Sequence, residues 1–264
     1  MIGVFDSGIG GLSVLSAIVR ALPRADLLYL ADTAHIPYGD KDEATIRGRA
    51  LRIGGYLAER GCRQIVVACN TATAAAVAAL RESLPRVGVI GVEPGVKPAA
   101  AASRSGRIAV LATASTARSE RLARLIRRHA GAARVDILPC PGWATKVETL
   151  RLDDPEFADT ARRLLEPVLA AGADRVVLGC THYTFLAPAL EKIVAGRALL
   201  VDVADAVARQ CRRLVEESGN ETPGRGRLAL MATAHPERLR RALTALDLEP
   251  LAARLSGPAV LVNI

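Results

Sequence analysis

Aromatic side chains are scarce in this 264-residue chain, where phenylalanine, tryptophan and tyrosine together make up 3% of the residues. The formal net charge is +8, and the basic residues are 31 arginines and only four lysines, spread along the whole sequence. Nucleic-acid-binding surfaces combine clustered basic residues with aromatic ones. The densest basic cluster, residues 118–128, instead places apolar side chains at helical spacing, which predicts an amphipathic helix with a solvated basic face.

The sequence also lacks the paired cysteine and histidine motifs of metal sites. Its five cysteines, at positions 62, 69, 140, 180 and 211, are odd in number and include no C-x-x-C, and its four histidines include no H-x-x-x-H. This pattern argues against both a disulfide framework and a zinc site. We therefore expect no metal, and a reducing cytoplasmic location.

Long apolar runs are missing as well. The longest mostly apolar stretch, around residues 64–80, is interrupted by Cys69, Asn70 and Thr71. No basic leader precedes the first apolar residues. We expect neither a signal peptide nor a membrane span.

Half of the residues are apolar, which is enough for one large core or two domains of ordinary size. Strand-like and helix-like patterns alternate, and this order predicts α/β layers with mainly parallel strands. Ligands of such folds bind at the carboxyl ends of the strands. The predicted strands lie near residues 2–5, 27–30, 64–68, 87–91, 107–112, 135–138, 175–179, 198–201 and 227–231.

Two similar segments stand out, 66–71 (VVACNT) and 177–182 (VLGCTH), each an apolar run that ends in a cysteine followed by small polar residues. Each run is typical of a buried parallel strand, and a helical pattern follows it. Cys69 and Cys180 are therefore predicted at strand-to-helix turns, where helix N–H groups favour a thiolate and lower the thiol pKa. Two such cysteines in equivalent contexts suggest a pair facing one substrate from opposite sides.

A glycine-rich loop, residues 6–11 (DSGIGG), follows the first strand and opens a helix at Leu12, where backbone N–H groups can receive an anion. A dinucleotide fingerprint is disfavoured because its third glycine would fall at Ser13. Asp6 is either a helix cap alone or a hydrogen-bond partner of a thiol or of a substrate ammonium.

Other polar positions are less specific. Residues 37–39 (PYG) predict a turn that presents backbone groups and the Tyr38 phenol. His182 is a core histidine, the group that sets the protonation of Cys180 or one ligand of a metal pair, and sequence spacing does not place Glu148. Residues 91–98 predict a crossing between domains, and residues 217–226 a polar surface loop. The remaining cysteines, Cys62, Cys140 and Cys211, are expected to be small buried residues.

Four blocks together resemble the signature of the glutamate racemase family in order and spacing, from residue 2 to about residue 210. The blocks are residues 6–11, Asp32 with 37–39, residues 68–73 (ACNTAT) and residues 178–183 (LGCTHY). The sequence departs from the family pattern where His35, Ser115, Leu150 and Thr184 stand.

This resemblance implies a fold of two similar α/β domains with mainly parallel sheets and an active site in the cleft between them. The first domain would comprise residues 1–94 and 206–264 and contain Cys69, and the second would comprise residues 95–205 and contain Cys180. The implied activity is interconversion of L- and D-glutamate without a cofactor, supplying D-glutamate for peptidoglycan. An aspartate racemase or related isomerase of the same fold is the alternative.

The resemblance also implies roles for single residues. Cys69 would act on the D-enantiomer and Cys180 on the L-enantiomer, with Asp6 assisting Cys69 and with His182 and Glu148 assisting Cys180. Glutamate would be held by Asp6, Ser7, Tyr38, Gly39, Asn70, Thr71, Thr113, Thr181 and His182. A homodimer and a contact with DNA gyrase are the partners that the resemblance implies besides glutamate.

The chemistry of racemisation requires two such groups. One must remove the α-proton from one face while the other delivers a proton to the opposite face, so one thiol starts as thiolate and the other as thiol. With each sulfur at a near-attack distance from the α-carbon, the sulfurs should lie roughly 7 Å apart. A pyridoxal mechanism would need a Schiff-base lysine. The lysines, at positions 41, 97, 146 and 192, occupy no recognisable setting for one.

Overall fold

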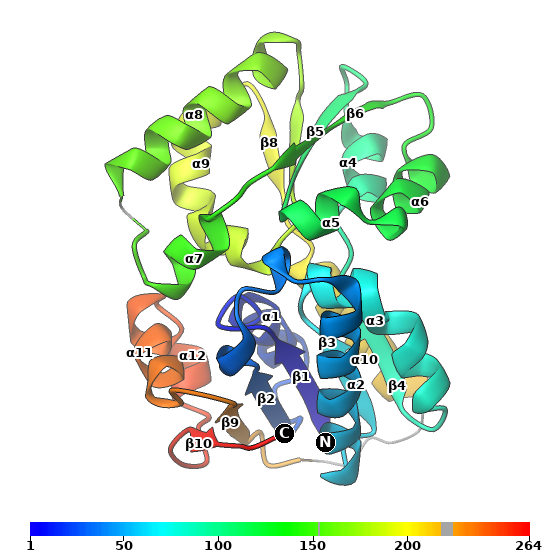
Figure 1. Cartoon of the computed structure of the whole chain (residues 1–264), viewed down its shortest axis with the longest axis vertical. Coiled ribbons are helices and arrows are strands. Elements are labelled where there is room, and N and C mark those ends of the chain that lie inside the picture. The colour runs from blue at the N-terminus through cyan, green and yellow to red at the C-terminus, as the bar shows by residue number, and fades with distance from the viewer. Residues whose placement is uncertain (153, 218–223) are drawn as a thin grey trace.

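The computed structural model describes residues 1–152, 154–217 and 224–264, which form two parallel sheets covered by helices (Figure 1). The larger sheet, lower in the figure, has the strand order β10-β9-β2-β1-β3-β4, and the smaller one has the order β6-β5-β7-β8. All nine predicted strands are confirmed, and β10 was missed because it has only two residues. The strands are β1 (Ile2–Asp6), β2 (Leu27–Ala31), β3 (Gln64–Val67), β4 (Gly88–Gly91), β5 (Arg107–Ala112), β6 (Arg134–Pro139), β7 (Arg175–Leu178), β8 (Leu199–Val201), β9 (Leu228–Ala232) and β10 (Val260–Leu261).

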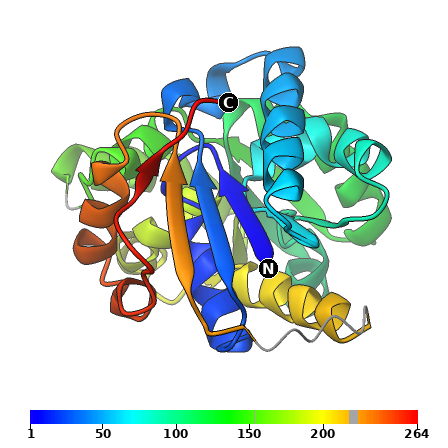
Figure 2. The same ribbon diagram turned by 90° about the horizontal axis from the view of Figure 1, so that it is seen from below.

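Helices cover both faces of the larger sheet, as the view from below shows (Figure 2). Because strand side chains alternate between faces, Val4 and Val66 belong to the core beneath α1, whereas Phe5 and Val67 belong to the core beneath α2 and α3. The helices are α1 (Leu12–Ala21), α2 (Glu43–Glu59), α3 (Asn70–Ser83), α4 (Val96–Ala102), α5 (Ala114–Arg118), α6 (Glu120–His129), α7 (Trp143–Glu148), α8 (Pro155–Ala170), α9 (Ala187–Val194), α10 (Ala204–Glu217), α11 (Glu237–Ala245) and α12 (Glu249–Ala252). Residues 120–128 of the basic cluster form the predicted amphipathic helix, α6, which buries Leu122, whereas Arg118 ends α5.

The strand registers bring the predicted site residues to facing edges of the two sheets. Phe5 pairs with Val67, so Asp6 and Cys69 leave the larger sheet at the same edge. Leu111 pairs with Leu178, so Thr113 and Cys180 leave the smaller sheet side by side. Ligands of parallel α/β sheets bind at this carboxyl edge.

The two cysteine turns differ in detail. Cys69 caps α3, with its sulfur accepting the Ala72 N–H at 3.5 Å, whereas Cys180 precedes a 3₁₀ turn, Thr181–Leu186, instead of the predicted α-helix. The reason is Pro188, which lacks an N–H group and fits only the first turn of an α-helix, so α9 begins at Ala187.

The chain passes from the larger sheet to the smaller one and back. Helix α4 packs on β5 and β7 of the smaller sheet, and α10 returns to pack on α1, β3 and β4. The domain limits at residues 94/95 and 205/206 stay a prediction, and most of the predicted loop at 217–226 lies outside the described residues. In the described part of the chain, no helix is long and apolar enough to cross a membrane.

Candidate active site

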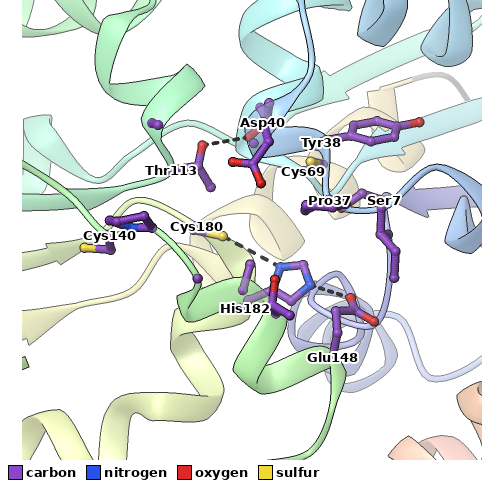
Figure 3. Close-up of a pocket in the computed structure, with 18 of the residues that line it drawn as sticks. Ser7, Pro37, Tyr38, Asp40, Cys69, Thr113, Cys140, Glu148, Cys180 and His182 are labelled. Carbon is purple, nitrogen blue, oxygen red and sulfur yellow. Dashed lines mark hydrogen bonds and ion pairs between the residues drawn. The ribbon is translucent and has the colours of Figure 1, made fainter. Parts of the chain in front are cut away.

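A cavity of about 280 Å³ lies between the facing edges of the two sheets (Figure 3). Cys69 reaches it from the larger sheet and Cys180 from the smaller one, and both sulfurs belong to buried residues. Of the predicted site residues, the cavity is lined by Ser7, Tyr38, Gly39, Cys69, Asn70, Thr71, Thr113, Glu148, Cys180 and His182. Asp6 and Thr181 are buried directly behind this lining.

Asp6 and Cys69 form one acid–base pair. Asp6, at the end of β1, is fully buried, and its Oδ2 accepts the Gly11 N–H at 2.7 Å. Burial raises the pKa of the Asp6 carboxyl, although the nearby His182 and a hydrogen bond with Cys69 oppose the rise. Burial and the neighbouring Asp6 charge likewise raise the pKa of the Cys69 thiol. The prediction that the helix N-terminus lowers the thiol pKa is therefore wrong for Cys69, because the effect of desolvation on this pKa outweighs that of the hydrogen bond from Ala72.

Cys180, His182 and Glu148 form a relay on the other side of the cavity (Figure 3). The Cys180 sulfur lies 3.7 Å from Nδ1 of His182, and Nε2 of the same ring lies 2.6 Å from Oε1 of Glu148. Burial opposes a charge on the imidazole, but hydrogen bonds to Cys180 and Glu148 outweigh it and raise the pKa of His182 well above its ordinary value. Of the roles left open for His182, this geometry favours the partner of Cys180.

The glycine-rich loop fits closely around this relay. Its Ile9 N–H donates to Oε1 of Glu148 at 2.8 Å, so a backbone group expected to receive an anion is occupied by a carboxylate of the protein itself. A Cβ atom on Gly8 would lie 1.8 Å from that same oxygen, and one on Gly10 would lie 2.3 Å from Nδ1 of His182. Because these glycines have no side chain, the loop that follows β1 can lie directly against Glu148 and His182 from the other sheet's side of the cavity.

Hydroxyl groups from both sheets meet on another wall of the cavity. Thr71 Oγ1 lies 3.0 Å from Thr113 Oγ1 and 3.2 Å from Thr116 Oγ1. These two contacts join the start of α3 to the start of α5. Beside them Asn70 is 4% exposed, and neither its Oδ1 nor its Nδ2 has a partner among the described residues. A buried amide without partners is costly unless a ligand or water satisfies it.

The Tyr38 phenol does not face the cavity as predicted. It points away (Figure 3) and donates to Oδ2 of Asp32 at 2.6 Å. Asp32 is fully buried and also receives two hydrogen bonds from Arg49, at 2.8 and 2.9 Å, which compensate for its burial and lower its pKa. Tyr38 and Gly39 still line the cavity, and an added Cβ on Gly39 would lie 3.0 Å from Cβ of Thr113.

Among the residues that line the cavity or complete its threonine cluster, Asp40, Thr116, Cys140 and Arg238 were not predicted as site residues. Cys140 was expected to be merely buried; it lines the cavity, but its thiol donates to the Leu138 carbonyl at 3.2 Å, and burial keeps its pKa high. Thr116 lies three residues after Thr113, which is capping spacing and could have indicated it. Nothing in the local sequence around Asp40 or Arg238 points to the cavity.

Two buried thiols thus lie at facing sheet edges, each beside its own titratable partner, an arrangement that suits proton transfer on opposite sides of one small molecule. The model of the Asp/Glu/Hydantoin racemase family matches residues 2–211, and the chain belongs to this family. A glutamate racemase of Pseudomonas aeruginosa is 46% identical over 243 residues, which cover 92% of each chain.

Solved structures agree with this assignment. The glutamate racemase of Escherichia coli, in complex with L-glutamate and the activator UDP-MurNAc-Ala, matches with a TM-score of 0.86 and 31% identity over 100% of this chain and 98% of that one. The glutamate racemase of Thermus thermophilus, in complex with β-chloro-D-alanine, matches with a TM-score of 0.81 and 39% identity over 100% and 96%. The fold of two parallel α/β sheets is thus confirmed.

Proposed function

We propose that this enzyme interconverts L- and D-glutamate by proton transfer through two thiols, and so supplies D-glutamate for peptidoglycan. The observation that supports it most is the entry of Cys69 and Cys180 into one buried cavity from opposite sheets. The close relatives named above, which cover nearly the whole chain, are glutamate racemases.

In the direction from L- to D-glutamate, Cys180 removes the α-proton and Cys69 delivers one to the opposite face. A protonated His182 at 3.7 Å favours negative charge on the Cys180 sulfur, and Glu148 stabilises the imidazolium through the 2.6 Å contact. Cys69 starts as a thiol, as its raised pKa requires. In the reverse direction the roles exchange: Asp6 accepts the proton of the Cys69 thiol, and the resulting thiolate removes the α-proton of D-glutamate while Cys180 delivers one to the opposite face.

The substrate's polar groups account for the unpaired atoms of the cavity. The Asn70 amide offers a donor and an acceptor that have no partner among the described residues, and the hydroxyls of Thr71 and Thr113 lie beside it. These groups suit a carboxylate and an ammonium group. Ser7 and the backbone of Tyr38 and Gly39 complete the binding set. The ammonium group, once bound, would also favour the thiolate of whichever cysteine acts as base.

Three finer features belong to the proposal. The five cysteines of the chain are all free thiols, which fits a reducing cytoplasm. The homodimer and the contact with DNA gyrase rest on the family resemblance alone. No group of three or more His, Cys, Asp and Glu side chains in the described ranges is placed to hold a metal ion, and the proposed proton transfers use only side chains of this chain.

The proposal is tested by circular dichroism of the purified protein incubated with D-glutamate and, separately, with D-aspartate. We expect racemisation of glutamate, loss of activity in Cys69→Ala and Cys180→Ala, and full activity in the control Cys211→Ala, whose thiol is buried near Gln64 and away from the cavity. Preference for aspartate would support the alternative isomerase. Full activity in either of the first two variants would refute the two-thiol mechanism.

A further inference from the structure

One arginine lines the cavity. Arg238, on α11 (Glu237–Ala245), is exposed, and it is the only arginine or lysine among the described residues that line the cavity. Its guanidinium makes no hydrogen bond or ion pair with any residue of the described ranges. Helix α11 lies below α7, which ends at Glu148 (Figure 1), and Arg238 and Glu148 together also line a neighbouring hollow.

The charges around the cavity make this arginine significant. Asp40 and Glu148 place two carboxylates on the lining, and protonated His182 and Arg238 place two cations there. Without Arg238 the lining would be net negative, and a thiolate would add to that charge. Glutamate itself is an anion at neutral pH, because it has two carboxylates and one ammonium. A negative cavity would repel it.

We propose that Arg238 is a capture residue, which attracts the anionic substrate to the cavity mouth and helps to retain it there through its charge. The inference deepens the proposed function, because it assumes that the ligand is an anionic amino acid. A free, exposed guanidinium can act in this way without a fixed contact, since charges in a cleft raise the local concentration of an oppositely charged ligand.

The expected effect follows from Coulomb's law. Two unit charges about 7 Å apart, at an effective dielectric constant between about 40 and 80, attract strongly enough to change binding by about three- to tenfold. Salt screens exposed charges, with a Debye length near 10 Å at 0.1 M and near 3 Å at 1 M. Arg238→Gln should therefore lower kcat/KM about three- to tenfold at low salt, with kcat little changed, and the difference should shrink towards none at high salt.

The test compares wild type, Arg238→Gln, Arg238→Lys and a control, Arg240→Gln. Arg240 lies on the same helix, is also exposed, and does not line the cavity, so its loss changes the net charge equally. For each variant, kcat/KM is measured for both enantiomers, and the dissociation constant of D-glutamate by calorimetry, in about 20 mM to 1 M NaCl. We expect a salt-dependent loss in Arg238→Gln, equal in both directions, recovery in Arg238→Lys, and no loss beyond twofold in Arg240→Gln.

Equal salt dependence of Arg238→Gln and wild type, or an equal loss in Arg240→Gln, would overturn the inference. So would a loss in Arg238→Gln that persists undiminished at high salt, since that indicates a short-range contact. Failure of the proposed function is a separate result, in which the wild-type protein does not racemise glutamate. Calorimetry still decides the role of Arg238 in that case: salt-dependent glutamate binding that Arg238→Gln weakens supports it, and absence of such binding overturns it.

Discussion

A single methyl group at Gly8 should disrupt the relay that serves Cys180. The backbone torsions at Gly8 lie outside the left-handed region, so an alanine there changes only the occupied space. Its Cβ would lie 1.8 Å from Oε1 of Glu148, the atom that accepts from Ile9 N–H at 2.8 Å and contacts His182 at 2.6 Å. Glu148 must therefore move, and both contacts are lost.

Each hydrogen bond to a charged group is worth about 1.5–3 kcal/mol. If the loss of these contacts removes from the transition state the stabilisation of one such hydrogen bond, Gly8→Ala should lower kcat/KM roughly 10- to 150-fold in both directions. Circular dichroism measures this change. The matched control is Gly55→Ala in α2, where an added Cβ meets nothing within 4 Å. That variant should keep its activity and gain about 0.5–1 kcal/mol of stability, because alanine favours a helix over glycine.

A double-mutant cycle separates this local effect from general misfolding. Once Glu148→Ala has removed the carboxylate, the methyl group of Gly8→Ala has space, so the second substitution should cost little more in kcat/KM or in unfolding free energy. If Gly8→Ala costs as much in the Glu148→Ala background as in wild type, the argument from close approach is wrong. Wild-type kcat/KM in a folded Gly8→Ala variant would refute it too.

Three further outcomes are expected. Asp32→Asn leaves Arg49 buried with a weakened partner and should destabilise the fold by about 3 kcal/mol near pH 7 in urea unfolding, a difference that shrinks as pH falls through the lowered Asp32 pKa. His182→Asn should increase the primary isotope effect on kcat/KM more for α-deuterated L-glutamate than for the D-enantiomer, since His182 serves Cys180; the opposite asymmetry contradicts that assignment. Racemisation should persist after dialysis against chelator without added pyridoxal phosphate, whereas loss of activity would refute the two-thiol chemistry.

Sequence patterns were sufficient for the parts of the site that local rules determine. Asp6 ends a buried parallel strand, and Cys69 and Cys180 come within two residues after one, so that parallel sheets bring such positions to a common edge. Their presence around one cavity therefore follows from periodicity and strand order. The same reasoning located the helix start at Leu12, because a glycine-rich turn precedes it.

The rest of the site depends on contacts between distant segments, which no local pattern encodes. Glu148 comes at the end of a six-residue helix, yet it contacts Ile9, 139 positions earlier in the chain. The Tyr38 phenol turns away because Asp32 is anchored by Arg49 from α2, a partner 17 residues along the chain. Arg238 reaches the cavity because α11 and residues 148–150 at the end of α7 line one hollow beside it.

These long-range contacts also tie the chemistry to the meeting of the two sheets. Hydrogen bonds cross between them around the cavity: Ile9 N–H to Glu148 at 2.8 Å, the Ser13 hydroxyl to the Thr181 carbonyl at 3.3 Å, and the contacts of the Thr71 hydroxyl with those of Thr113 and Thr116. Any separation wide enough to release a ligand through this boundary breaks some of them. Because Glu148 accepts from Ile9 across this boundary and also contacts His182, the position of Glu148 in the relay is held from both sheets.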